Sequence, residues 1–202
     1  MGNCCKKIFL RNERNQELYD VNIIDNMTTD CVDILKNCTN CQIPDFSFCG
    51  LFTLCKVVDI YDADTFRVVF FRNKEDKEPM KIKVRASGCN AAEMYPLKSH
   101  PNRKEEMIKA RLARNRLLEL VTDIKINLEN TDYIKDDIEN MLSENKKLVY
   151  IKFDNFDKYG RVLGTLYINK DDEISVNQIL INENHAVLYS GGKRNKNKLT
   201  IS

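Results

Sequence analysis

The stretch that decides the fold covers residues 56–96 and reads KVVDIYDADTFRVVFFRNKEDKEPMKIKVRASGCNAAEMYP. Apolar residues alternate along both of its halves, and a charged segment at 73–79 separates them. A period of two is typical of strands that bury one face. The pattern therefore predicts strands at about Phe52–Tyr61, Thr65–Arg72 and Met80–Gly88, with a hairpin turn between the last two.

Two aspartates interrupt the first half of this stretch. Asp62 and Asp64 lie two positions apart, so in an extended chain their side chains point the same way. Carboxylates at such a bend suit a cation that prefers oxygen ligands. Arg85 ends the third predicted strand, and Glu93 follows eight residues later on a loop of Gly, Asn and Ala. An acidic pair, a guanidinium and a further carboxylate at strand ends indicate a site for phosphoryl chemistry.

A third motif lies far downstream. Residues 157–161 read DKYGR, and the apolar run VLGTLYI follows. DxDT before a strand, VR(x)7E and DKYGR before a strand together resemble the staphylococcal-nuclease-like (thermonuclease) family, in the family's order. Each motif alone is weak because short acidic and glycine patterns recur by chance. The resemblance covers about residues 55–189.

The resemblance implies an α+β, mainly β fold: an OB-type five-stranded barrel with two or three flanking helices. Periodicity alone indicates a mixed, mostly antiparallel barrel or sheet. The remaining strands are expected at Leu148–Phe153 and Arg161–Ile168, and Ala186–Tyr189 closes the fold.

The helices follow from apolar spacing. The longest is expected at about Asn102–Val121, with Asn102 and Glu105 as a capping box and with solvated basic residues at Lys109, Arg111, Arg114 and Arg116. Shorter helices are predicted at 30–37, around Ile134–Leu142, and from Val176 to a stop at Asn184.

The chain divides into three parts by pattern. Residues 1–50 form a leader, 51–190 the nuclease-like domain and 191–202 a basic tail. Residues from about 122 to 147 are longer than a family connection and indicate an insertion. A length of 202 residues with 43% hydrophobic residues suits one domain with an extension.

Composition says little about partners. A net charge of +2 is too small to indicate a nucleic-acid binder, and the 31% of charged residues are mixed in sign. Eight cysteines without a secretory signal favour a reduced, intracellular, cytoplasmic protein that is not secreted. Ordinary thiols are favoured over a structural zinc site built from Cys31, Cys38, Cys41 and Cys49.

The N-terminus carries Gly2, Cys4 and Cys5 followed by two lysines, which resembles a dual acylation signal. Such a signal would tether the protein to the cytoplasmic face of a membrane. Lys6 stands where the motif prefers Ser or Thr, so an unmodified tail is the alternative. No stretch approaches the length of a membrane-spanning helix.

The resemblance also implies residue roles. Asp64 matches a calcium ligand, Asp62 lies in the matching nearby acidic position, and Glu93 matches the general base. Arg85 and Arg161 match the arginines that bind the phosphate. The positions that match nucleotide contacts are Lys158, Tyr159 and Tyr189. Calcium is the expected cofactor, with no small-molecule cofactor.

Four positions depart from the family. Asn90 stands where the family has a second aspartate ligand, and Ala91 stands where it has a threonine that ligates through its carbonyl and side chain. Ala63 replaces a glycine, and Ala92 replaces a proline. An amide oxygen still coordinates calcium but lacks the charge, so we expect a weakened metal site with the base and arginines intact. Ala63 would be strained if its position requires a positive φ.

Two main hypotheses remain. The first is a calcium-dependent nuclease, expected as a monomer, that cleaves DNA and RNA to 3′-phosphates. The second is a catalytically weakened or inactive relative that binds nucleic acid or protein on the barrel. A lipid-anchored adaptor is a third reading. Taken singly, the site residues also suit ordinary turns and solvated surface.

Overall fold

The computed structural model describes residues 29–40 and 43–189. The chain forms two compact units, Met1–Phe46 and Ser47–Ser202. In the first unit, helix α1 (Thr29–Asn37) confirms the short helix predicted at 30–37. The strands and the other three helices of the described residues lie in the second unit. Within the described ranges, no helix has both the length and the apolar character needed to cross a membrane.

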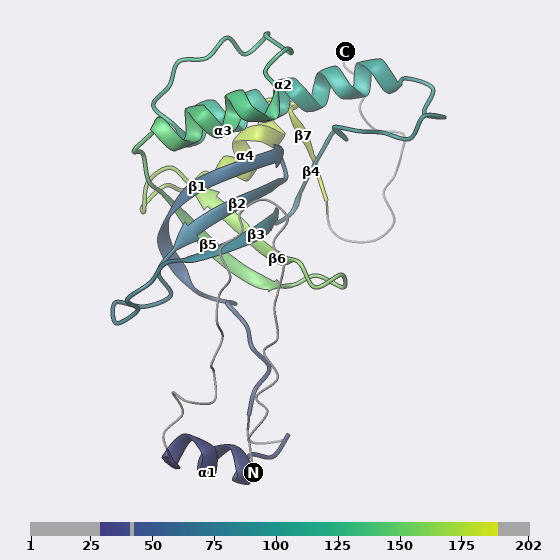
Figure 1. The fold of residues 1–202 in the computed structure, drawn as a ribbon. Helices are drawn as coiled ribbons and strands as arrows, with labels where there is room; N and C mark the ends of the chain where they lie inside the picture. The colour runs from purple at the N-terminus through teal and green to yellow at the C-terminus, as the bar shows by residue number, and fades with distance from the viewer. Residues whose placement is uncertain (1–28, 41–42, 190–202) are drawn as a thin grey trace, which may run out of the picture. The chain divides into compact units, whose positions relative to one another are not determined.

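Five strands of the second unit close into a barrel in the order β1-β2-β3-β6-β5 (Figure 1). Neighbouring strands are antiparallel, except that β3 and β6 are parallel. The predicted five-stranded, mainly β barrel of the α+β class is therefore confirmed. The strands are β1 (Phe52–Asp62), β2 (Thr65–Phe70), β3 (Met80–Ala86), β5 (Val149–Phe156) and β6 (Val162–Tyr167).

The barrel interior follows the alternation seen in the sequence. On β2, Phe66, Val68 and Phe70 are buried, while Arg67 between them is exposed. The rings of Phe70 and Phe153 lie 4.8 Å apart between centroids. Phe48, which precedes the first strand, adds a third ring at 5.6 Å from Phe70. Burial of these aromatic side chains stabilises the closed sheet.

Three helices pack on one side of the barrel (Figure 1): α2 (Arg103–Val121), α3 (Lys135–Glu144) and α4 (Val176–Asn182). All three confirm helices predicted from apolar spacing. α2 and α3 pack against β1, and α4 packs against β6. Asn184 has φ 61°, the left-handed conformation expected where the last helix stops.

The capping box predicted for α2 is wrong. Asn102 has φ −107° and ψ 40°, outside the extended conformation of a capping residue, and its side chain makes no cap hydrogen bond. A different bond forms near the helix start, because the Glu93 amide donates to Glu106 Oε1 at 3.1 Å. This bond attaches the loop that carries Glu93 to α2.

The loop predicted after the third strand contains a short strand, β4 (Cys89–Ala91). It pairs antiparallel with β7 (Ala186–Leu188) near the end of the described chain. Cys89 lies opposite Leu188, and Ala91 lies opposite Ala186. Three residues are too few for a pattern of alternation, and their partner lies almost a hundred positions away. Local sequence therefore could not predict this strand.

The side chains of α2 hold the segment that enters α3. Arg111 donates to the Thr131 carbonyl, and Arg114 donates to the Tyr133 carbonyl. Asn115 donates to the carbonyls of Leu128 and Asn130. These hydrogen bonds are 2.7–3.1 Å long. The prediction that the basic residues of this helix are solvated is wrong for Arg114, which is buried. Helix periodicity does not reveal that another segment covers this face.

Candidate active site

The acidic pair lies at the tight turn between β1 and β2. Asp62 pairs with Thr65 across the turn, and the pairing of β1 becomes irregular just before it. Both carboxylates are almost fully buried, with Asp62 7% and Asp64 2% exposed. The Asp64 amide lies 3.3 Å from Asp62 Oδ1. Asn184 is the only non-glycine residue with positive φ in the described part, so Ala63 is not strained in that way.

The Asp64 carboxylate joins three strands. Its Oδ1 forms an ion pair with the Arg85 guanidinium from β3 and accepts a hydrogen bond from the Thr65 hydroxyl at 3.0 Å. Its Oδ2 accepts from the Ala91 amide of β4 at 2.6 Å. The backbone carbonyl of Asp64 also accepts from the Ala86 amide at 2.8 Å. One buried carboxylate thus fixes the ends of β2, β3 and β4 against each other.

Arg85 completes this cluster. Its Nη2 donates to Asn90 Oδ1 at 2.7 Å and to the Cys89 carbonyl at 3.3 Å. The guanidinium therefore spans from Asp64 to the start of β4. Its fork can serve two acceptors at once, which is also how it would bind a phosphate. In this structure those donors are directed to the protein itself.

The oxygen atoms near the turn suit a hard cation. Asp62, Asp64, the Asn90 amide and the Ala91 carbonyl are the kinds of ligand that calcium takes. Asp64 Oδ1 and Asn90 Oδ1 are both hydrogen-bonded or ion-paired to Arg85, so a cation would compete with that guanidinium. In residues 29–40 and 43–189, no group of three or more His, Cys, Asp or Glu side chains could hold a metal ion. The oxygen donors at this turn are of the types that calcium takes, and only two of them, the carboxylates of Asp62 and Asp64, carry charge.

The protonation of Asp62 depends on its surroundings. Burial raises the pKa of this carboxyl above its ordinary value, while a hydrogen bond with Thr65 and the charges of Arg85 and Lys83 act in the opposite direction. A buried carboxyl with a raised pKa holds its proton more tightly than one in water. A bound cation would therefore compete with a proton at Asp62.

Glu93 lies two residues beyond β4. Ala91, the last residue of that strand, is bonded to Asp64, and the Glu93 amide is bonded to α2 through Glu106. The Glu93 side chain is exposed. Both ends of this short connection are therefore fixed, which restricts the backbone position from which the Glu93 side chain projects.

The DKYGR segment forms the turn between β5 and β6. Arg161 forms an ion pair with Asp157 at 2.6 Å, and the backbone amides of Tyr159 and Arg161 both donate to Asp157 Oδ1 at 2.9 Å. The exposed Tyr159 ring lies 5.5 Å from the Arg161 guanidinium and 5.0 Å from the Lys158 amine. Gly160 has φ 75°, which this turn requires.

Strand pairing relates this turn to Arg85. β3 and β6 are parallel, with Val84 opposite Val162. Both valines are buried in the barrel, so Arg85 on β3 and Arg161, which immediately precedes β6, are expected to point to the outer face. From strand spacing and rise, their Cα atoms lie roughly 8 Å apart. Both arginines are thus on the same face of the barrel.

The other predicted positions are distributed as follows. The Tyr189 amide donates to the Gly88 carbonyl at 2.9 Å, which locates Tyr189 beside the turn between β3 and β4. The proposed acylation positions, Gly2, Cys4 and Cys5, lie outside the described residues.

Sequence reasoning assigned no role to two residues that position others, Asn177 and Asp157. Asn177 is buried at the start of α4 and donates to the carbonyls of Ser87 and Gly164, at 3.0 and 3.3 Å, which connects β3 with β6. Asp157 holds Arg161 in place. For Asp157, the sequence pattern that could have indicated its role is its position four residues before Arg161 in a turn. For Asn177, it is the presence of an amide side chain beside apolar positions of a helix.

Comparison with known proteins gives one family. The model of the family described as staphylococcal nuclease homologue matches residues 131–201. This segment contains α3, the DKYGR turn with its two strands, α4 and β7. Asp64, Arg85 and Glu93 lie before it, so their assignment depends on the geometry above. No sequence among the curated proteins matches the chain.

Proposed function

Because the chain resembles the staphylococcal nuclease homologues through residues 131–201, we propose that it is a nuclease that hydrolyses phosphodiester bonds of DNA and RNA with calcium. One observation carries the proposal most strongly. Asp64, Arg85, Asn90 and Ala91 form a single hydrogen-bonded cluster, and Arg161 lies on the same outer face one strand away. These are groups that phosphodiester hydrolysis requires in one place.

In the proposed reaction, the two arginines bind the phosphate. Guanidinium groups stay charged and donate two parallel hydrogen bonds to phosphate oxygens. Arg161 is oriented by Asp157, and its side chain is partly exposed. Arg85 exchanges its present acceptors, Asp64 and Asn90, for phosphate oxygens. This exchange leaves Asp64 with an unneutralised charge.

Glu93 is the proposed general base. A carboxylate accepts a proton from the attacking water when it is held within hydrogen-bond reach. The attachments of the loop to Asp64 and to Glu106 restrict where this carboxylate lies. The proton moves from water to Glu93 as the water oxygen attacks phosphorus. The bond from phosphorus to the 5′-oxygen breaks, and this oxygen takes a proton from solvent, which gives a 3′-phosphate and a 5′-hydroxyl.

Calcium would be held by Asp62, Asp64, the Asn90 amide oxygen and the Ala91 carbonyl. When bound, it supplies positive charge beside the phosphate. Asp64 is shared between this role and its ion pair with Arg85. Phosphate binding that draws Arg85 away should therefore increase calcium affinity, and the reverse must hold by linkage.

The bound strand is proposed to contact the exposed DKYGR turn. Tyr159 offers a ring for stacking and Lys158 a charge for the backbone. Tyr189 directly follows β7, and its amide is bonded to Gly88, three residues beyond Arg85 in the chain.

The test is hydrolysis of single-stranded DNA by the full chain in excess calcium. We expect Glu93→Gln to reduce the rate by about 10²–10⁴-fold, the range of general-base catalysis. Glu105→Gln, an exposed glutamate of α2, is the matched control and should retain activity. Equal background rates in the wild type and Glu93→Gln would overturn the nuclease proposal.

The alternative proposal is a binding module that does not cut. It is favoured by the amide at Asn90, which gives the cluster only two carboxylates near the turn. Asn90→Asp separates the two proposals. Cleavage that appears only in this variant would mean that the natural protein binds without cutting.

We also propose that the protein acts as a cytoplasmic monomer, anchored to a membrane surface when Gly2 and a neighbouring cysteine are acylated. The support is the sequence pattern of Gly2, Cys4 and Cys5 with two lysines. Metabolic labelling with myristate and palmitate tests the anchor, with Gly2→Ala as the control. Absence of both labels in the wild type would exclude it.

A further inference from the structure

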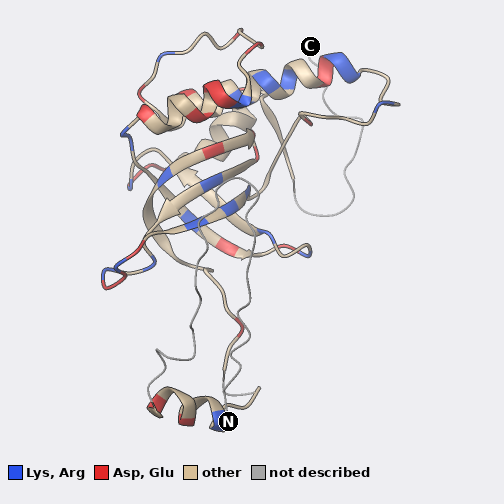
Figure 2. Ribbon diagram, viewed as in Figure 1, with Lys and Arg blue, Asp and Glu red and all other residues tan. Residues whose placement is uncertain are grey.

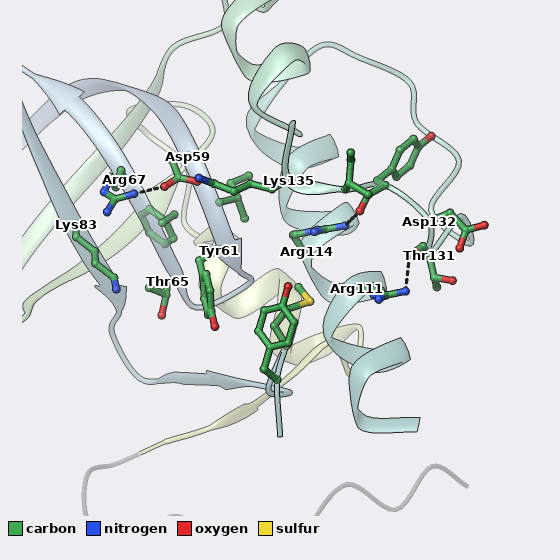
Figure 3. A pocket seen from close by; sticks show the side chains of 16 residues that line it. Asp59, Tyr61, Thr65, Arg67, Lys83, Arg111, Arg114, Thr131, Asp132 and Lys135 are labelled. Carbon is green, nitrogen blue, oxygen red and sulfur yellow. Dashed lines mark hydrogen bonds and ion pairs between the residues drawn. The ribbon is translucent and has the colours of Figure 1, made fainter. Parts of the chain in front are cut away.

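A cavity of about 580 Å³ lies beside the candidate active site, between the barrel and α2 (Figure 3). Its walls come from β1, β2 and β3, from the loop at 94–95, from α2, and from the segment at 131–135 that leads into α3. The volume is within the range of small-ligand sites. Thr65 and Lys83 line it; Thr65 directly follows Asp64, and Lys83 lies two residues before Arg85.

The cavity is rich in basic residues. Arg67, Lys83, Arg111, Arg114 and Lys135 line it, against the two acidic residues Asp59 and Asp132. Figure 2 shows basic residues on both flanking parts, the barrel strands and α2. Arg67 is paired with Asp59, and Lys135 is paired with Glu139 at 2.9 Å. Three cations remain for which the described residues provide no ion pair within 4 Å: Lys83, Arg111 and Arg114.

The two arginines of α2 that line the cavity donate only to backbone carbonyls. Arg111 donates to the Thr131 carbonyl at 2.9 Å, and Arg114 donates to the Tyr133 carbonyl at 2.7 Å (Figure 3). Carbonyl oxygens satisfy hydrogen bonds but do not neutralise charge. The cavity wall therefore contains two guanidinium groups whose charges are not balanced by an adjacent carboxylate.

Burial makes this arrangement costly at Arg114. Its side chain is 6% exposed, and its Nε has no hydrogen-bond partner. Burial lowers its pKa, and the nearby charge of Arg111 lowers it further, while Asp137 acts in the opposite direction. A buried charge without a close counter-ion is unfavourable. An anion in the cavity would offset this penalty.

Two exposed tyrosines are among the residues that line the cavity. Tyr61 and Tyr95 line it and are 50% and 68% exposed, and their ring centroids lie 6.3 Å apart. Lys83 Nζ lies 6.0 Å from the Tyr61 ring. Exposed aromatic rings beside cations are the combination that binds a base and its phosphate.

We propose that this cavity binds a nucleotide, with its phosphate drawn to Lys83, Arg111 and Arg114 and its base against Tyr61 and Tyr95. The nucleotide is either free or one unit of a nucleic-acid strand. The strand form rests on the proposed nuclease function, since the strand would then extend from the candidate active site into the cavity. The free form does not.

The test uses the full chain without divalent ions. Calorimetry compares adenosine 5′-monophosphate with adenosine and with inorganic phosphate, and we expect the monophosphate to bind at least about tenfold more tightly than either. Arg111→Gln and Tyr95→Leu should each reduce its affinity about tenfold. Lys104→Gln, on the same helix outside the cavity, and Arg161→Gln, in the candidate active site, should not.

A second experiment, with an oligonucleotide, distinguishes a free nucleotide from one unit of a nucleic-acid strand. A labelled single-stranded oligonucleotide is titrated into the Glu93→Gln protein, with and without Arg111→Gln. A loss of affinity for the oligonucleotide alone assigns the cavity to a strand, and a loss for the monophosphate as well assigns it to nucleotides in general. If Arg111→Gln and Tyr95→Leu, each folded by circular dichroism, leave both ligands unchanged, the proposal is overturned.

These results remain distinct from the test of catalysis. Hydrolysis lost in Glu93→Gln with no effect of cavity variants on any ligand would leave the nuclease proposal standing and remove the nucleotide cavity. If instead the cavity variants weaken binding of the monophosphate and the wild type shows no hydrolysis, the nucleotide cavity stands and the nuclease proposal is removed.

Discussion

The candidate active site and the neighbouring cavity manage buried positive charge in different ways. In the first, Arg85 is paired with the buried carboxylate of Asp64 and bonded to Asn90. In the second, Arg111 and Arg114 contact backbone carbonyls and have no ion pair with a carboxylate of the described chain. The first site is satisfied by its own residues, while the second retains charge for an external anion.

This difference has a consequence for binding. A ligand of the active site must replace an existing ion pair, so part of its interaction energy opens the Asp64–Arg85 pair. A ligand of the cavity meets charges that are already in place, and preorganised groups bind at lower cost. We therefore expect simple phosphate compounds to interact with the cavity more readily than with Arg85.

The largest effect should come from matched substitutions of the two buried arginines. Arg85→Met leaves the Asp64 charge buried without its partner, and breaking a buried pair costs about 3–5 kcal/mol. Arg114→Met leaves no buried carboxylate without a partner and loses one hydrogen bond, which is worth about 1 kcal/mol. Urea unfolding of both variants measures the free energies. Equal losses would contradict the contrast between the two sites.

A second prediction strengthens the active site alone. Asn90→Asp adds a negative charge beside Arg85 and Asp64, so calcium affinity should rise about tenfold, since ligand charge tunes such sites. Calorimetry with calcium measures it. The matched control is Asn73→Asp, in the exposed turn between β2 and β3, where no change in calcium affinity is expected. An unchanged affinity in Asn90→Asp would remove this residue from the metal site.

A third prediction concerns pH at the acidic turn. Because the folded pKa of Asp62 is raised, its contribution to stability is best at low pH and worsens as pH rises through that pKa. Asp62→Asn should therefore be more stable than the wild type at pH 7 without metal, and the two should converge as the pH approaches the ordinary aspartate value. Thermal unfolding across pH measures this, and a less stable variant at pH 7 would contradict it.

The smallest effect is expected at the DKYGR turn. The pKa of Asp157 is lowered, whereas that of Asp62 is raised, so the two carboxyls change stability with pH in opposite directions. Burial acts to raise the pKa of Asp157, but hydrogen bonds and charge from Arg161, with the Tyr159 amide, lower it overall. Asp157 therefore stabilises the fold above the ordinary aspartate pKa and loses this effect as pH falls through the lowered value. Asp157→Asn should lose less than about 1 kcal/mol at pH 7. A gain in stability there would be the opposite result.

Much of the fold was predictable because strands and helices that bury one face repeat apolar residues at a fixed period. The alternation along β1, β2 and β3 and the arc of apolar residues on α2 are examples. The pairing of β4 with β7 and the burial of Arg114 were not predictable. Both depend on segments distant in sequence, which leave no local pattern.

The sequence motifs identified candidate site residues but could not predict the contacts among them. The motifs identified Asp64 and Arg85, and the structure joins them directly. Their direct pairing could not be read from the sequence, because spacing does not tell which donors a buried carboxylate will select. The aromatic and basic cavity was missed for a similar reason, since its wall combines Tyr61, Tyr95 and Arg111 from three separate segments.

The central claim is that Arg85 and a cation share Asp64, so that phosphate and calcium bind together. The most direct measurement is calorimetry of calcium binding with and without a nucleoside 3′,5′-bisphosphate, in the wild type. We predict that the bisphosphate increases calcium affinity, by a factor of at least about five, the lower end of typical coupling. The same calcium affinity in its presence and absence would contradict the claim.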